Sequence, residues 1–165
     1  PVQFLAPDLP ETVRRTLLKT GLAPHRLTLE ITERILLDNS AEIIQKLAKH
    51  KKLGVLNALD DFGTGFSSLS YLRSFPFDKI KIDRSFVSDL DTGSSHAVIV
   101  QAVVSIARAL GMTTTAEGVE TEEQRALLAA LGYDKAQGYL FGEAVPADKV
   151  PDVIEAFAPK KRVAA

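Results

Sequence analysis

Short runs of β-branched residues alternate with amphipathic stretches along the whole chain. Glycines and capping residues mark most of the boundaries, as Gly21 does after the first helix and Thr121 with Gln124 does as a capping box. The predicted strands are residues 27–31, 55–59, 79–83, 113–116 and 137–141. The predicted helices are residues 11–20, a segment from Asn39-Ser40 to near Gly54, a short one with Leu69 and Leu72, 96–110, one with Leu127, Leu128 and Leu131, and 147–157.

Repeated strand-then-helix units predict an α/β fold with parallel strands joined by right-handed crossovers. Both an open doubly wound sheet and a closed barrel satisfy this pattern. The first strands carry no Gly-x-Gly-x-x-Gly fingerprint, which disfavours a dinucleotide-binding sheet. A complete (β/α)8 barrel needs about 200 to 250 residues or more, so the chain is expected to form about five of its eight units.

Composition and charge narrow the function classes. The chain has 165 residues, 45% of them hydrophobic, and its 20 basic and 21 acidic side chains leave a formal charge of −1. This balance gives no reason to expect binding to DNA or to a membrane surface. The longest apolar stretch, residues 97–110, is interrupted by Gln101, Ser105 and Arg108, which predicts one solvated helix face and no membrane span.

Other features of the chain bear on compartment and completeness. The absence of cysteine excludes disulfides and thiolate chemistry and fits a reducing compartment such as the cytoplasm. No signal peptide is visible, and the chain opens at Pro1 without an initiating Met, as expected of a fragment. The domain is expected to cover residues 1–158, and the basic tail, residues 159–165, to be disordered.

Polar residues stand at the end of every predicted strand. In parallel α/β folds the functional site lies at the carboxyl ends of the strands. Each of these residues alone could be a turn former or a helix cap, but five coincidences together favour a site. The residues are Glu30, Asp60 with Asp61, Lys81 with Asp83, Glu117 and Gln137.

Carboxylates and an amide without cysteine form an oxygen cage that suits Mg²⁺, Mn²⁺ or Ca²⁺ rather than zinc. The three histidines, His25, His50 and His96, lie in polar stretches near helix ends, so all three are expected at the surface. Adjacent aspartates at one strand end suit two metals about 3.5 to 4 Å apart, an arrangement that hydrolyses phosphodiesters. Because a strict strand points Asp60 and Asp61 to opposite faces, the chain must bend there.

Two features near these acids leave alternatives open. Lys81 in an acidic cluster either contacts a substrate oxyanion or water, or forms a stabilising ion pair with Asp83 or Glu117. The loop at residues 63–66 either presents N–H groups to a phosphate or closes over the site, and it is not a P-loop.

The chain resembles the EAL domain of bacterial cyclic di-GMP phosphodiesterases over nearly its whole length. The matching segments are Leu29-Glu30-Ile31-Thr32-Glu33, Ala58-Leu59-Asp60-Asp61-Phe62-Gly63-Thr64-Gly65, Lys79-Ile80-Lys81-Ile82-Asp83, Ala116-Glu117-Gly118-Val119-Glu120-Thr121 and Gln137-Gly138-Tyr139-Leu140-Phe141. The resemblance implies a modified (β/α)8 barrel that hydrolyses cyclic di-GMP to linear pGpG with Mg²⁺ or Mn²⁺ and is inhibited by Ca²⁺.

The resemblance also implies residue roles. Glu30, Asp60 and Asp61 would be metal ligands, Lys81 would contact the catalytic water, and Glu117 would be the general base or a ligand. Among the remaining positions, Gln137 would position a metal-bound water or the substrate, Glu33 and Glu120 would be supporting carboxylates, and Glu33 would tie down the loop at residues 60–68.

The front of the chain departs from the family. The strand with the Glu-Ala-Leu motif and the strand with an Asn ligand are not present, and Pro1-Val2-Gln3-Phe4 resembles the segment just after that Asn. The missing strands would leave an unpaired strand edge. They also motivate a second hypothesis, a module that binds cyclic di-GMP without cleaving it.

A third hypothesis is another metal-dependent barrel enzyme, for example one acting on an enolate. Partners implied by the resemblance are a second copy of the chain, contacted through the loop and helix after Asp61, and fused sensory or cyclase domains. The location implied for the domain is the cytoplasm.

Overall fold

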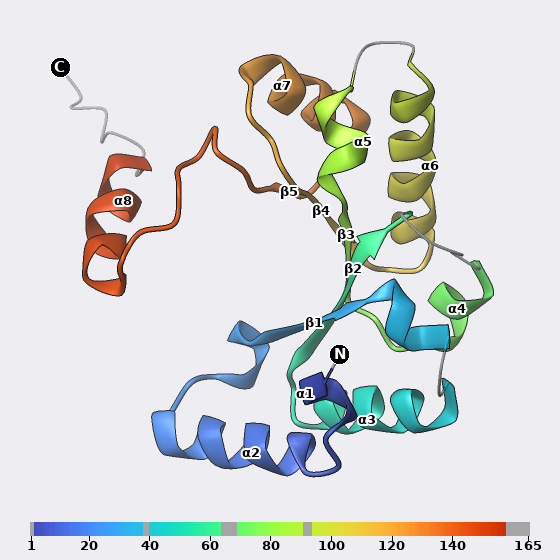
Figure 1. Ribbon diagram of the computed structural model, residues 1–165, viewed down its shortest axis with the longest axis vertical. Coiled ribbons are helices and arrows are strands. Elements are labelled where there is room, and N and C mark those ends of the chain that lie inside the picture. The colour runs from blue at the N-terminus through green and yellow to red at the C-terminus, as the bar shows by residue number, and fades with distance from the viewer. Residues whose placement is uncertain (1, 38–39, 64–68, 91–93, 158–165) are drawn as a thin grey trace, which may run out of the picture.

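The computed structural model describes residues 2–37, 40–63, 69–90 and 94–157. Its centre is a five-stranded parallel sheet in which each strand pairs with its predecessor and successor in sequence, as the strand-helix pattern predicts. Figure 1 shows the strands fanning out with helices outside them. The strands are β1 Thr28–Thr32, β2 Leu56–Phe62, β3 Lys79–Ile82, β4 Thr113–Ala116 and β5 Lys135–Ala136.

The helices follow the strands in alternation, and α8 stands apart from the sheet (Figure 1). The capping box at Thr121 and Gln124 is confirmed at the start of α7. Within the described residues no helix is long and apolar enough to cross a membrane. The helices are α1 Val2–Leu5, α2 Leu9–Thr20, α3 Ser40–Lys52, α4 Leu69–Ser74, α5 Arg84–Ser88, α6 Ser95–Ala109, α7 Glu122–Leu131 and α8 Val150–Phe157, with 3-10 turns η1 Pro24–Arg26, η2 Glu33–Leu37 and η3 Ala147–Lys149.

The two faces of the sheet differ in polarity, and this difference positions the site. Alternate residues point to opposite faces of a strand. Ile31, Leu59 and Ile80 lie on the outer face, are at most 1% exposed, and pack with Ile43 and Leu47 of α3. Burying each such side chain stabilises the fold by about 1.5 to 3 kcal/mol. The intervening residues of the same strands therefore face inward, and these include Glu30, Asp60 and Lys81.

Two sequence-based expectations are wrong. Residues 137–141 do not form a strand, because β5 ends at Ala136 and the chain then turns sharply against Val119. His50 is not at the surface but fully buried, at 0% exposure, on the inner side of α3. By contrast, the helix face with Gln101, Ser105 and Arg108 is exposed as predicted.

Candidate functional site

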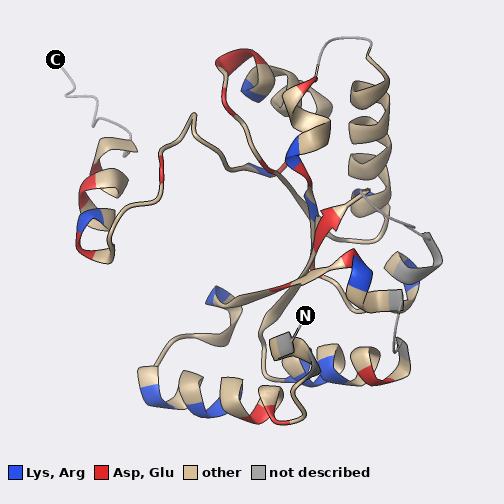
Figure 2. Ribbon diagram, in the orientation of Figure 1, with Lys and Arg blue, Asp and Glu red and all other residues tan. Residues whose placement is uncertain are grey.

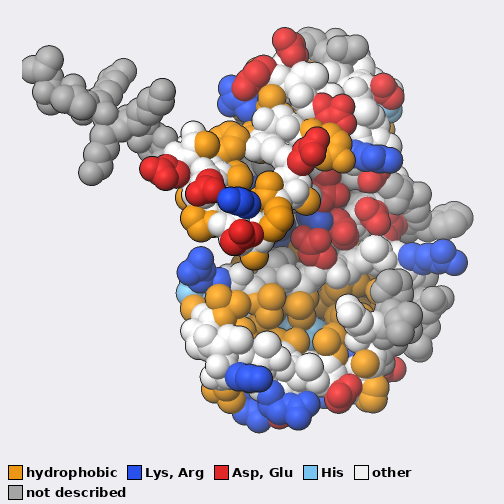
Figure 3. All heavy atoms as spheres, turned by 60° about the vertical axis from the view of Figure 1, so that its left-hand side comes forward, with side chains coloured by type: hydrophobic (Ala, Val, Ile, Leu, Met, Phe, Trp, Pro, Cys, Tyr) orange, Lys and Arg blue, Asp and Glu red, His pale blue; other side chains and the backbone are white. Residues whose placement is uncertain are grey.

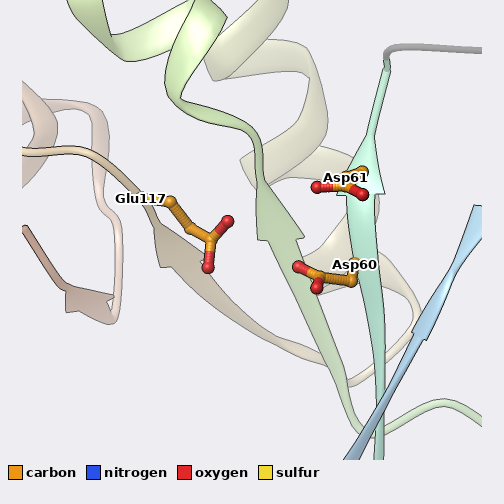
Figure 4. Close-up of side chains that lie close together, drawn as sticks. All are labelled: Asp60, Asp61 and Glu117. Carbon is orange, nitrogen blue, oxygen red and sulfur yellow. The ribbon is translucent and has the colours of Figure 1, made fainter.

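Three carboxylates from two strands meet at the carboxyl end of the sheet. Asp60 and Asp61 lie near the end of β2, and Glu117 directly follows β4. One oxygen of each carboxylate lies within 4.8 Å of the other two. Figure 4 shows Asp60 and Glu117 turned toward one another across β3, with Asp61 one step farther along β2. Figure 2 places acidic positions at this end of β2, and Figure 3 shows acidic side chains gathered around the middle of one face.

An irregularity in β2 allows the neighbouring aspartates to share this site. The pairing of β2 with β3 shifts register between Leu59 and Phe62. Asp61 has a φ of 54°, the one positive φ of a non-glycine residue among the described residues. Asp tolerates this left-handed conformation better than most residues do. The predicted bend is therefore present, although it lies inside the strand as a bulge instead of in the loop after it.

Lys81 lies at the centre of the acidic cluster. Its ammonium group lies 2.7 Å from Glu30 Oε2, 3.0 Å from Asp60 Oδ1 and 2.6 Å from Glu117 Oε1, and its side chain is only 5% exposed. Three N–H donors thus face three carboxylates. Of the alternatives left open by the sequence, the ion pair with Glu117 is present, and the pair with Asp83 is replaced by pairs with Glu30 and Asp60.

The ionisation of these groups follows from burial and mutual charge. Burial alone lowers the pKa of Lys81, but its hydrogen bonds with Glu117, Glu30 and Asp60 outweigh this and raise the pKa above its ordinary value. Burial raises the pKa of Glu117, although Lys81 opposes the shift. The pKa of Asp61 is raised by burial and by the charges of Asp60 and Asp83. Lys81 therefore stays charged, while the acids hold excess negative charge that favours a cation.

Gln137 lies at the same end of the sheet, where its amide donates a 2.8 Å hydrogen bond to Glu117 Oε1. Its position depends on a close approach that the sequence did not reveal. A Cβ on Gly138 would overlap the backbone N and O of Val119. Val119 N–H donates to the Gln137 carbonyl, and Leu140 N–H donates to the Val119 carbonyl. Only glycine allows these segments to meet and Gln137 to reach Glu117.

Gly138→Ala is expected to displace Gln137 and to reduce any activity of the site by about tenfold or more, because misplacement near 1 Å costs on this scale. The control is Gly142→Ala, since Gly142 also has a positive φ but open space around its Cβ position. Comparison of thermal unfolding and activity of the two variants separates the clash from backbone strain. Equal behaviour of the variants would contradict this role of Gly138.

The other predicted residues lie around the cluster. Asp83 is the N-cap of α5, and its Oδ1 accepts the Ser85 N–H at 3.0 Å. Hydrogen bonds from the side chain and the backbone of Ser85 lower the pKa of Asp83. Glu33 is buried in η2, whereas Glu120 is exposed before α7. The carboxylate of Glu30 reaches Lys81 but does not belong to the three-acid group. Residues 64–68 of the predicted loop lie outside the described residues.

The donor set fits a hard divalent cation. Asp60, Asp61 and Glu117 offer only oxygens, all close enough to share an ion. With Glu30 added, the cluster holds four carboxylates and one ammonium, a formal charge of −3 when all are ionised. Such an excess is costly unless cations balance it. The acidic cluster could therefore hold a metal ion.

Comparisons with known proteins agree with this geometry. Residues 1–144 match the model of the EAL domain. A protein of Sinorhizobium fredii, y4lL, is 53% identical over 149 residues, which are 90% of this chain and 18% of that protein. The bifunctional diguanylate cyclase/cyclic di-GMP phosphodiesterase MucR of Pseudomonas aeruginosa is 40% identical over 90% of this chain and 22% of its own. The chain thus spans about a fifth of the length of these curated relatives.

Solved structures have the same fold. The phosphodiesterase MucR in complex with cyclic di-GMP superposes with a TM-score of 0.86 at 40% identity, over 90% of this chain and 66% of that one. BlrP1 of Klebsiella pneumoniae, solved with cyclic di-GMP and manganese or calcium, gives 0.79 at 35% identity, over 86% of this chain and 36% of that one. With the strand-end acids and Lys81 in place, these matches establish that the chain belongs to the EAL domain family.

Proposed function

We propose that the domain to which this chain belongs hydrolyses cyclic di-GMP to linear pGpG with Mg²⁺ or Mn²⁺. The observation that carries the proposal is the convergence of Asp60, Asp61 and Glu117 oxygens within 4.8 Å beside a buried lysine. A relative with cyclic di-GMP phosphodiesterase in its name and related structures solved with this ligand and manganese support the substrate and the metal.

In this proposal Asp60, Asp61 and Glu117 hold two metal ions, and Glu30 joins them as a ligand. Bound metal would polarise the phosphoryl oxygen and lower the pKa of the attacking water. The carboxylates would hold Lys81 less tightly when they share their oxygens with cations. The Lys81 ammonium could then donate to the water or to a phosphate oxygen.

Glu117 and Gln137 then act on the proton and on orientation. The raised pKa of Glu117 brings it closer to the working range of a general base, so it can accept the proton of the attacking water. The Gln137 amide donates to Glu117 Oε1, which leaves the other carboxylate oxygen free to accept that proton. Glu33, Glu120 and Asp83 are supporting residues in the proposal, with Asp83 acting through the start of α5.

The proposal extends to assembly and location. A second copy of the chain would contact the loop and helix after Asp61, and sensory or cyclase domains would be fused to the domain, as the name of MucR illustrates for that relative. The domain, residues 1–158, would work in the cytoplasm.

The test is turnover by the whole protein. Mn²⁺-dependent conversion of cyclic di-GMP to pGpG is expected, followed by chromatography, and removal of metal with EDTA is expected to stop it. Replacement of Mn²⁺ by Ca²⁺ is expected to leave binding but no product. Tight binding without product under saturating Mn²⁺ would contradict the proposal and identify a receptor instead.

A further inference from the structure

His50 is a buried titratable residue behind the site. It is fully buried on α3, and the Phe4 ring of α1 packs against it edge-on at 5.9 Å between centroids. Asn57, the second residue of β2, faces it from the sheet. Neither ring nitrogen has a partner within ordinary hydrogen-bond geometry among the described residues. The Asn57 side chain is the polar group that faces the ring, and it can accept one ring proton. Because the described surroundings offer no acceptor for a second ring proton, the neutral form fits better than the charged form.

The charged groups described around His50 do not stabilise a positive charge on its ring, because they either repel it or are paired with other cations. From α3 itself, Lys46 lies one turn away, 6% exposed, with its ammonium 2.9 Å from Glu42 and 3.1 Å from the Phe4 carbonyl. From the segment before β3, Asp78 accepts from Lys51 at 2.9 Å and from the Asn57 N–H at 3.0 Å. Both nearby carboxylates are thus engaged with other cations. Burial lowers the pKa of His50, the Asn57 side chain opposes this, and Lys46 adds to it.

Asn57 connects the buried His50 to the acidic residues of β2. Its side-chain amide donates to the Leu47 carbonyl of α3 at 3.2 Å and to the Pro76 carbonyl at 3.3 Å. Asn57 therefore fixes the start of β2 between α3 and the segment that leads into β3. Asp60 follows three residues later, across two residues that are at most 1% exposed. Because the intervening residues are closely packed, a displacement of Asn57 is expected to be transmitted to Asp60 and Asp61.

We propose that neutral His50 is a positioning residue for Asp60 and Asp61, and that its protonation displaces β2 and weakens metal binding at the acids. The consequence for turnover rests on the proposed function, whereas the consequence for the strand and for metal binding does not. His50 touches neither the acids nor a metal and acts through Asn57.

The direction of the pH effect follows from the sign of the shift. The pKa of His50 in the folded protein lies below its ordinary value of 6.5. Above pH 6.5 the residue is neutral whether the chain is folded or unfolded, so the positioning of β2 by neutral His50 is fully present. As the pH falls below 6.5, protons bind preferentially to states in which His50 has left its buried position. The positioning of β2 is therefore lost as the pH approaches the pKa of His50 in the folded protein. One proton limits the effect to tenfold per pH unit.

The experiment compares Mn²⁺ affinity of the protein and of His50→Leu between pH 8 and pH 5.5. The affinities are expected to be similar at pH 8. At pH 5.5 the unchanged protein is expected to lose several-fold more affinity than the variant, because both share the titration of the acids but only one carries His50. His25→Gln, a change at an exposed histidine of η1, is the matched control and is expected to follow the unchanged protein.

Two further measurements keep the outcome decisive. Hydrogen exchange of the β2 amides, compared between proteins at the same pH without metal, is expected to rise at pH 5.5 only where His50 is present. If His50→Leu does not fold, His50→Gln, which also cannot titrate, is expected to flatten the pH profile in the same way. Parallel affinity and exchange profiles for the unchanged protein and the variant would overturn the inference.

Turnover separates this inference from the proposed function. If the protein cleaves cyclic di-GMP, kcat is expected to fall below pH 6.5 more steeply than in the variant, with KM changing less. If the protein cleaves nothing at any pH, the proposed function fails, and the Mn²⁺ profiles alone decide the role of His50.

Discussion

Lys81→Met is expected to abolish turnover and to destabilise the metal-free protein by about 3 to 5 kcal/mol, the cost of breaking a buried ion pair from one side. Lys81 is 5% exposed and contacts three carboxylates, so its loss leaves Glu30, Asp60 and Glu117 facing one another without a cation. Chemical denaturation gives the stability, and product chromatography gives the turnover.

Added Mn²⁺ is expected to restore much of the lost stability but none of the activity. A bound cation offsets the repulsion among the acids, because binding to the native state stabilises it. It does not replace the ammonium that donates to substrate or water. The matched control is Lys79→Met, because Lys79 lies two residues earlier on the same strand face but has no carboxylate within 4.0 Å among the described residues. A Lys81→Met protein that cleaves cyclic di-GMP at the normal rate would contradict the role of Lys81.

The sequence predicts the strand-end acids well because their position depends on a simple rule. In a parallel sheet with sequential order, strand ends meet at one edge, so Asp60, Lys81 and Glu117 converge whatever the details of packing. For Asp60 and Asp61, the sequence predicted only that the chain must bend if both are to share one site. How the chain meets that requirement, through a register shift and a left-handed Asp61, depends on pairing with β3 that no local pattern encodes.

The two errors have separate physical causes. Residues 137–141 have the apolar content of a strand, but the close approach of Gly138 to Val119 ends the pairing. His50 lies in a lysine-rich stretch, directly before Lys51 and Lys52, so its neighbours in sequence indicate a surface position. Its helical phase indicates the opposite, since Ile43, Leu47 and His50 share the spacing of a buried face. Phase is the better guide inside a helix, and it would have revealed the buried histidine.

Glu117→Gln is expected to lower kcat by about 10² to 10⁴-fold, the range for loss of a general base, with additional loss from weaker metal binding. Glutamine keeps the shape of the side chain and can still contact Gln137, but it cannot accept the proton of a water molecule. It also removes one of the charges around Lys81, 2.6 Å away. The variant is therefore expected to remain folded, as thermal unfolding will report.

The decisive comparison for Glu117→Gln is between binding and turnover. Calorimetry with cyclic di-GMP in the presence of Ca²⁺ is expected to show binding within a few-fold of the unchanged protein, while product formation with Mn²⁺ is lost. Glu123→Gln, a change at an exposed residue in the first turn of α7, is expected to alter neither. Loss of ligand binding together with turnover would assign Glu117 to holding the metal and substrate instead of to proton transfer. Full activity of Glu117→Gln would show that Glu117 is not part of the active site, and that the three-acid cluster does not cleave the phosphodiester.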